Sequence, residues 1–205
     1  DSPQDAGTRS EELARTGRFF FERGWVPATA GNFSARLDER HMVITASGRH
    51  KGELEAGDFL VVGLDNEVRP PGGKPSAETQ LHLQRYRAEP QVGAVLHTHS
   101  LPATVLSRLN PGGVVLEGYE VLKALPGVDT HAARLVVPVF GNDQDISRLS
   151  EHVEAFLRAH PGVPGYLIEG HGLYTWGRTV TDARRHVEAF EFLLACELEV
   201  RRLSR

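Results

Sequence analysis

The sequence predicts a single compact domain of the α/β class. Its 205 residues are close to the ~100–200 residues of one ordinary domain. A hydrophobic fraction of 40% and a charged fraction of 24% are typical of a soluble globular protein. Strand-like apolar runs alternate along the chain with segments of helical periodicity. We therefore expect one domain over residues 10–205, preceded by a polar, loose N-terminal segment over residues 1–9.

Five segments are predicted to be helices from their periodicity and their end signals. The first begins at Ser10, an N-cap residue followed by acidic residues, and stops at Gly24. The fourth has the clearest amphipathic repeat, and the fifth carries one apolar stripe along its whole length. The predicted helices span residues 10–24, 76–86, 101–109, 145–160 and 181–198.

Strands are predicted where short apolar or β-branched runs are bounded by turn residues. Pro138 interrupts one such run and indicates an edge strand or a bulge, because proline cannot donate a hydrogen bond to a neighbouring strand. In the last predicted region, strand-like residues lie on both sides of His171. The predicted strands span residues 41–46, 59–64, 92–99, 135–140 and 165–177.

Composition and motifs exclude several classes of function. The formal net charge of −4 gives no reason to expect nucleic acid or an anionic membrane as a partner, and no run approaches the ~20 apolar residues of a membrane span. Cys196 is the only cysteine, so an intrachain disulfide is impossible and a reducing, cytoplasmic location is expected. The absence of a P-loop, a GxGxxG motif and a GxSxG motif disfavours nucleotide hydrolysis, dinucleotide binding and serine hydrolysis.

The strand over residues 92–99 ends in two histidines separated by one residue. Side chains alternate between the faces of a strand, so His97 and His99 are expected to point to the same side. Two neutral nitrogen ligands at this spacing suit a divalent metal such as zinc. The pair alone is more typical of one packed and one exposed structural histidine, so a third ligand is needed to favour a metal site.

A third histidine lies between two glycines, in Gly170-His171-Gly172. Glycine allows close backbone approach and unusual dihedral angles, so this imidazole is expected to be aimed at a ligand. With His97 and His99 it would supply three neutral ligands and leave one position open, as in catalytic zinc sites. Such a zinc ion is a strong Lewis acid, and the chemistry it implies is proton abstraction beside a polarised carbonyl.

Proton abstraction needs a carboxylate base, and Glu78 and Glu120 are the candidates. Glu78 follows Ser76, the natural N-cap of the second predicted helix. An acidic residue in the first turn of a helix also interacts favourably with the helix dipole. The residues alone leave both interpretations of Glu78 open.

Three loops could bind the phosphate of a substrate. The loop over residues 47–52 offers the hydroxyl of Ser47, the backbone of Gly48 and the cation of Lys51. Ser76 lies at a helix start, where free backbone N–H groups attract anions. The turn at Asn32 could donate in the same way, although it is also typical of an ordinary hairpin.

Five short motifs follow one another along the chain: Gly31-Asn32-Phe33-Ser34, Ser47-Gly48, Lys74-Pro75-Ser76-Ala77-Glu78-Thr79, His97-Thr98-His99-Ser100 and His171-Gly172. Together they resemble the class II aldolase/adducin family of zinc enzymes that act on sugar phosphates, over residues 10–203. This resemblance implies a three-layer α/β/α sandwich around a mostly antiparallel central sheet. It also implies Zn²⁺ held by His97, His99 and His171, a phosphorylated ketose as substrate, and a homotetramer with sites near subunit interfaces.

Four further segments closely resemble the dehydratases of this family, namely residues 47–52, 116–123, 142–145 and 170–177. This resemblance implies that water is eliminated from a phosphorylated ketose. It places Glu120 at the position of the acid/base glutamate, and Glu78 where aldolases carry a glutamate that binds zinc or acts as base. The alternatives are an aldolase or epimerase for another phosphorylated ketose, and an adducin-like binding domain without catalysis.

Overall fold

A computed structural model describes the backbone of residues 3–204 and the side chains of residues 5–204. Within these residues the centre is an eight-stranded sheet in the order β4-β3-β2-β1-β5-β10-β9-β8, and β6 and β7 form a separate pair. Neighbouring strands are antiparallel except β8 and β9, which are parallel. The strands are β1 Asn32–Arg36, β2 His41–Thr45, β3 Phe59–Gly63, β4 Val68–Arg69, β5 Ala94–Thr98, β6 Val114–Glu117, β7 Arg134–Val137, β8 Val139–Phe140, β9 Gly165–Ile168 and β10 Gly172–Gly177.

The helices are α1 Pro3–Glu22, α2 Thr79–Ala88, α3 Leu101–Leu109, α4 Ile146–Ala159 and α5 Val180–Leu203, with short 3₁₀ helices η1 Ala56–Asp58 and η2 Glu120–Ala124. Helix α2 connects β4 at one edge of the sheet to the central strand β5, whereas α4 connects the neighbouring strands β8 and β9. Between residues 3 and 204, no helix is long and apolar enough to cross a membrane.

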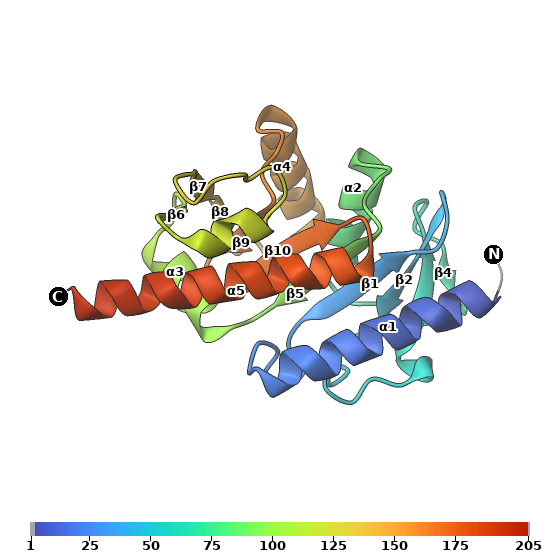
Figure 1. Cartoon of the computed structure of the whole chain (residues 1–205). Helices are drawn as coiled ribbons and strands as arrows, with labels where there is room; N and C mark the ends of the chain where they lie inside the picture. Colours follow the sequence, from blue (N-terminus) through green and yellow to red (C-terminus); the bar gives the residue numbers. More distant parts are fainter. Residues whose placement is uncertain (1–2, 205) are drawn as a thin grey trace.

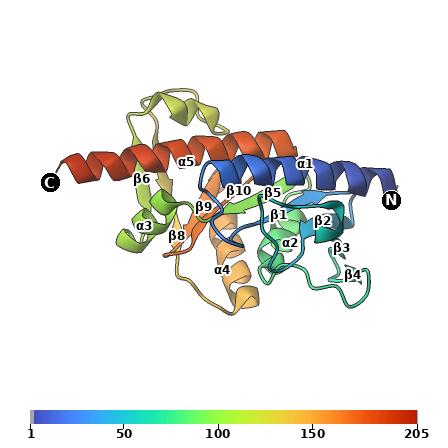
Figure 2. The same cartoon turned by 90° about the horizontal axis from the view of Figure 1, so that it is seen from below.

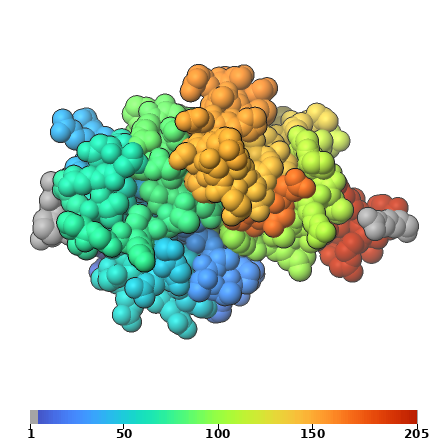
Figure 3. Space-filling model, turned by 180° about the vertical axis from the view of Figure 1, so that it is seen from behind, coloured from blue at the N-terminus to red at the C-terminus, as the bar shows by residue number. Residues whose placement is uncertain are grey.

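Helices cover both faces of the sheet (Figure 1, Figure 2). On one face, Leu13 of α1, Phe33 of β1 and Val187 of α5 belong to one apolar cluster. On the other face, a second cluster contains Leu81 of α2 and Leu149 of α4, and α4 stands out from this face in Figure 3. Because each sheet face buries its apolar residues under a different pair of helices, the predicted α/β/α sandwich is confirmed.

Strand β5 lies between β1 and β10 and presents alternate residues to the two outer layers. Val95 packs on the side of α2 and α4, and Leu96 packs on the side of α1 and α5. Alternation then directs His97 toward α2 and Thr98 toward α5. Thr98 accordingly donates its hydroxyl to Glu191 of α5 at 2.8 Å.

The N-terminal part of the chain differs from the prediction. The expected loose segment over residues 1–9 is wrong for residues 3–9, which form the first turns of α1, while residues 1 and 2 lie outside the described residues. Ser10 is therefore not an N-cap but a buried residue inside the helix. Asp5 in the first turn suits the true helix start, because negative charge is favourable there.

Strand β1 was not anticipated, whereas the effect of Pro138 was. β1 begins at Asn32, so only the first part of the expected turn over residues 29–34 is a turn. Gly31 makes it, with a φ of +89° that favours glycine. In the later chain, Pro138 separates β7 from β8, and β8 is the edge of the main sheet, as expected for a proline.

Candidate metal centre

Four side chains from three distant parts of the chain meet where β5 ends and β10 begins. Among the described residues, one potential ligand atom from each of Glu78, His97, His99 and His171 lies within 4.8 Å of the other three. We call these four residues the metal centre. Three of them are the predicted zinc ligands, and Glu78 is one of the two predicted carboxylates.

His97 of β5 and His99, just beyond the end of the strand, lie on the same side, as strand alternation predicts. Their Nε2 atoms are 2.7 Å apart. His97 is completely buried, and its ring stacks on Tyr174 of β10 with centroids 4.0 Å apart. The backbone N–H of His99 donates to the carbonyl of Trp25 at 2.8 Å, which fixes the chain just beyond the strand.

His171 reaches the same place from the turn between β9 and β10. Gly172, the next residue, has a φ of +157°, and a Cβ there would lie 2.0 Å from the carbonyl oxygen of Thr98. Only glycine allows β10 to approach β5 this closely. The glycines around His171 therefore have the steric role that the sequence predicted.

The hydrogen bonds of His97 and His171 direct their free nitrogen atoms toward one another. His97 Nδ1 donates to the carbonyl of Leu173 at 2.8 Å, and His171 Nδ1 donates to Asn142 Oδ1 at 3.0 Å. With their protons on Nδ1, both Nε2 atoms carry lone pairs, and they are only 3.3 Å apart. A metal ion between them would turn this repulsion into coordination, and a bonded Nδ1 is the usual support of a metal-bound histidine.

The side chain of Glu78 completes the centre. Its two carboxylate oxygens lie 3.5 Å from His97 Nε2 and 3.6 Å from His171 Nε2. Tyr174 donates its hydroxyl to Oε1 at 2.7 Å, and Asn32 donates its amide to Oε2 at 3.3 Å. Although Glu78 is the N-cap residue of α2, its side chain makes no capping hydrogen bond. Of the two interpretations that the sequence left open, the structure favours the place at the metal.

Burial and neighbouring charges set the ionisation of the centre. Burial lowers the pKa of His97 well below its usual value and the pKa of His99 to about 4. For Glu78, burial opposes ionisation, but the positive charge that His97 and His171 carry when protonated and the hydrogen bond from Tyr174 hold the pKa far below its ordinary value. Neutral imidazoles and an ionised carboxylate are the forms that bind a divalent metal.

A cavity of about 290 Å³ opens beside the metal centre. Glu78 and His99 line it on one side. The residues predicted to bind phosphate line the rest, namely Asn32, Ser47, Gly48, Lys51 and Ser76. The structure thus brings the predicted anion-binding loops and the metal centre to one cavity.

Two of these residues are more constrained than the sequence indicated. Lys51 is buried, and its ammonium donates to the carbonyls of Thr29 at 2.8 Å and Arg49 at 2.5 Å. Burial lowers the pKa of Lys51 to about 8, against the attraction of Glu78. Two of the three ammonium protons are bound, so one remains for a ligand. The Asn32 side chain is directed at Glu78, and its backbone is paired with His97 in the β1–β5 ladder.

Glu120 lies outside the metal centre of its own chain. It begins η2, and 72% of its side chain is exposed. Its carboxylate pairs with Lys123 at 2.5 Å and with His131 at 4.0 Å. The hydrogen bond from Lys123 lowers the pKa of Glu120. The carboxylate is therefore ionised and accessible, but it does not line the cavity beside Glu78.

Tyr174 and Asn142 are functional candidates that sequence reasoning missed. Tyr174 contacts both His97 and Glu78, and Asn142 fixes the ring of His171. Tyr174 is the register partner of His97 in the β5–β10 pair. The pairing register, which a single sequence does not reveal, is the signal that would have identified it.

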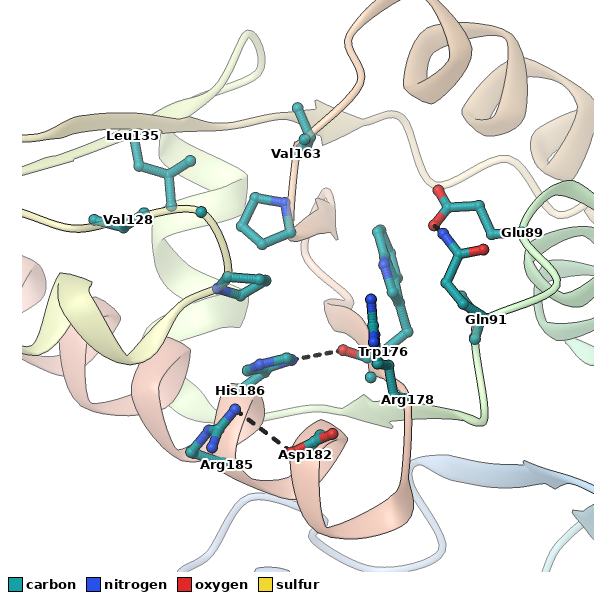
Figure 4. Close-up of a pocket in the computed structure, with 16 residues that line it drawn as sticks. Glu89, Gln91, Val128, Leu135, Val163, Trp176, Arg178, Asp182, Arg185 and His186 are labelled. Carbon is teal, nitrogen blue, oxygen red and sulfur yellow. Dashed lines mark hydrogen bonds and ion pairs between the residues drawn. The ribbon is translucent and has the colours of Figure 1, made fainter.

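A larger cavity of about 520 Å³ lies at the other end of β10, beside the start of α5 (Figure 4). Trp176 and His186 line it, and His186 Nδ1 donates to the carbonyl of Trp176 at 2.7 Å. Arg185, also at its wall, is paired with Asp182 at 3.5 Å. None of the predicted site residues lines this cavity, so the candidate chemistry lies at the smaller one.

Comparison with known proteins gives results that agree with this geometry. Residues 11–198 match the family described as the Class II Aldolase and Adducin N-terminal domain. The chain is 56% identical over 200 residues to a methylthioribulose-1-phosphate dehydratase of Marinobacter nauticus, covering 97% of this chain and 96% of the relative. A protein of the same name from Pseudomonas aeruginosa is 56% identical over 197 residues, covering 96% of each chain.

Solved structures share the fold. The crystal structure of L-fuculose-1-phosphate aldolase from Thermus thermophilus superposes with a TM-score of 0.76 at 25% identity, covering 95% of each chain. A sugar-phosphate aldolase from Thermotoga maritima has a TM-score of 0.75 at 21% identity, covers 97% of each chain, and supports the fold alone.

Proposed function

The chain belongs to the class II aldolase and adducin family, and on this premise we propose that it is a metal-dependent hydro-lyase that dehydrates 5-methylthioribulose 1-phosphate. The product is 2,3-diketo-5-methylthiopentyl 1-phosphate, a step of methionine salvage. The observation that carries the proposal is the 56% identity to dehydratases over nearly the whole chain. The four residues of the metal centre support it, because a binding domain without catalysis has no need of them.

We propose Zn²⁺ as the metal, held by His97, His99 and His171, with Glu78 as the fourth donor. Three imidazole nitrogens and one carboxylate are a donor set that zinc commonly takes. When bound, zinc would supply Lewis acidity toward an oxygen of the ketose. The partly buried Glu78 is then mainly a ligand, because its oxygens face His97 and His171 and accept from Tyr174.

The cavity walls are proposed to hold the phosphate. Asn32 lines the cavity together with four donor residues: Ser47 and Ser76 offer hydroxyls, Gly48 offers its backbone N–H group, and Lys51 offers its remaining ammonium proton. These donors lie beside Glu78 and His99, so a phosphate held by them would bring the carbons of the sugar to the metal centre. Such positioning supplies much of the rate of an enzyme that acts on a small substrate.

Glu120 is proposed to move the protons. It would take the proton from C3 and return one to the C4 hydroxyl, which leaves as water; tautomerisation of the resulting enol then gives the diketone. Its low pKa keeps it ionised and ready to accept. Because Glu120 is exposed and lies outside the cavity of its own chain, we propose that it acts in the site of a neighbouring copy within a homotetramer.

The reaction is tested by incubating the purified protein with methylthioribulose 1-phosphate and, separately, with L-fuculose 1-phosphate. Formation of the diketone from the first and no cleavage of the second is the expected result. Cleavage or epimerisation of the second compound with no dehydration of the first would replace the proposal by an aldolase or an epimerase.

The placement of Glu120 has its own test. His97→Ala and Glu120→Gln should each abolish turnover, and only Glu120→Gln should retain zinc. When the two chains are co-expressed, about a quarter of the sites in random mixed oligomers join an intact His97 to an intact Glu120 of a neighbour. Activity should therefore return in the mixture. Verified mixed oligomers with no activity would show that Glu120 does not act across the interface.

A further inference from the structure

His82 is a completely buried histidine beside the metal centre that no step of the proposed function uses. It lies on α2 four residues after Glu78, so both side chains leave the helix on the same face. Both ring nitrogens make short hydrogen bonds. Nε2 lies 2.5 Å from Asn32 Oδ1, and Nδ1 lies 2.6 Å from Ser34 Oγ.

The partners of His82 determine which nitrogen carries its proton. Asn32 must present its amide N–H to the Glu78 carboxylate at 3.3 Å, so its oxygen faces His82 and accepts from Nε2. Nδ1 then accepts from the hydroxyl of Ser34, which in turn accepts from Tyr86 at 2.8 Å. Burial lowers the pKa of His82 to about 3, against the attraction of Glu78, so the ring is neutral as this arrangement requires.

We propose that His82 is a positioning residue of the metal centre, which holds the Asn32 amide in the orientation that donates to Glu78. All the hydrogen bonds run in one direction, from Tyr86 through Ser34, His82 and Asn32 to the carboxylate. The four residues that precede Glu78 in this series of hydrogen bonds are all buried, and an unmade hydrogen bond is costly there. The inference rests on the proposed metal centre, but it does not depend on the substrate or the reaction.

Removal of the ring has a defined consequence. Without a donor at Nε2, the Asn32 oxygen loses its short hydrogen bond, and the amide that donates to the Glu78 carboxylate is no longer held in a fixed position. Loss of such a supporting hydrogen bond typically lowers metal affinity by ~10–100-fold. A residue that only filled space would leave metal affinity unchanged.

The test compares three variants by two measurements that need no turnover. Zn²⁺ affinity is measured by competition with a chelator, and ligand geometry is followed in the absorption spectrum of the Co²⁺-loaded protein. His82→Leu removes both hydrogen bonds, whereas His82→Gln keeps an N–H near the position of Nε2. The control is His186→Leu, which removes another buried histidine whose Nδ1 donates to Trp176 at the far end of β10.

We expect His82→Leu to lower Zn²⁺ affinity by ~10–100-fold and to change the Co²⁺ spectrum. His82→Gln should recover most of the Zn²⁺ affinity. His186→Leu should have the same Zn²⁺ affinity and Co²⁺ spectrum as the unsubstituted protein. Folded His82→Leu protein with unchanged affinity and spectrum would overturn the proposal, as would a His82→Gln variant as defective as His82→Leu. If the unsubstituted protein bound no metal, the proposed metal site itself would be refuted, and not the role of His82.

If His82→Leu does not fold, Asn32→Ala carries the test, because it removes the amide that His82 is proposed to hold. Zn²⁺ affinity should fall by a similar factor. Unchanged affinity in Asn32→Ala would overturn the proposal equally.

Discussion

Glu191 is a carboxyl group on α5 whose ionisation the fold opposes. It is 2% exposed, and one oxygen accepts the hydroxyl of Thr98 at 2.8 Å. The other oxygen, Oε2, has no hydrogen-bond partner among the described residues. Burial raises the pKa of Glu191 to about 7, although the hydroxyls of Ser100 and Thr98 act against the shift. We therefore predict that Glu191→Gln changes the pH dependence of stability.

The size of the effect follows from the two pKa values. An unfolded glutamate has a pKa of ~4.3, so between this pH and about 7 the folded protein retains a proton that the unfolded chain has lost. The stability that this retained proton contributes is fully present below pH ~4.3. It is lost as the pH rises through 7, at ~1.4 kcal/mol per pH unit. The glutamine cannot ionise. The free energy of unfolding of Glu191→Gln, relative to that of the unsubstituted protein, should therefore rise by about 3 kcal/mol between pH 4.5 and pH 8.

The assay is urea unfolding of both proteins at a series of pH values, with a chelator present so that metal release does not contribute. The matched control is Glu188→Gln on the same helix, whose side chain is 46% exposed and should show no comparable change. A difference in free energy of unfolding that stays constant from pH 4.5 to pH 8 would refute the reasoning, because it would mean that Glu191 is ionised in the folded protein at low pH.

Three further changes have expected outcomes. His171→Ala should reduce bound zinc to a small fraction by elemental analysis while leaving the circular dichroism spectrum unchanged; full zinc content would exclude it as a ligand. Gly172→Ala should destabilise the protein by at least about 2 kcal/mol in urea unfolding, because its Cβ would lie 2.0 Å from the Thr98 carbonyl oxygen; equal stability would contradict the close approach of β10. Lys51→Met should raise KM for the phosphorylated ketose by ~10-fold or more, with a smaller effect on the unphosphorylated compound; equal effects on both would remove Lys51 from the phosphate site.

The part of the site that depends on local geometry was predictable. His97 and His99 share a face because strands have a period of two residues, and His171 is aimed because the glycines beside it allow a close turn. Local rules left Glu78 ambiguous, since a helix start and a metal site both favour a carboxylate. The structure resolves this ambiguity, because it brings Glu78 at the start of α2 beside His97 of β5.

The contacts that a single sequence could not supply are those between elements. Tyr174 meets His97 because of the register between β5 and β10, and His82 meets Asn32 because α2 packs on β1. Periodicity predicted the helices, and the family resemblance predicted the α/β/α sandwich. β1 was missed because a short, central strand that begins with Asn32 has the composition of a turn.

The metal centre joins segments that are remote along the chain, and this has a consequence for how the protein unfolds. His97 and His171 are 74 positions apart, so an ion held by both is a removable cross-link between β5 and the β9–β10 hairpin. By mass action, free Zn²⁺ at 1,000 times its dissociation constant would add ~4 kcal/mol to the free energy of unfolding. The cell's zinc supply would then set the lifetime of the folded chain as well as its activity.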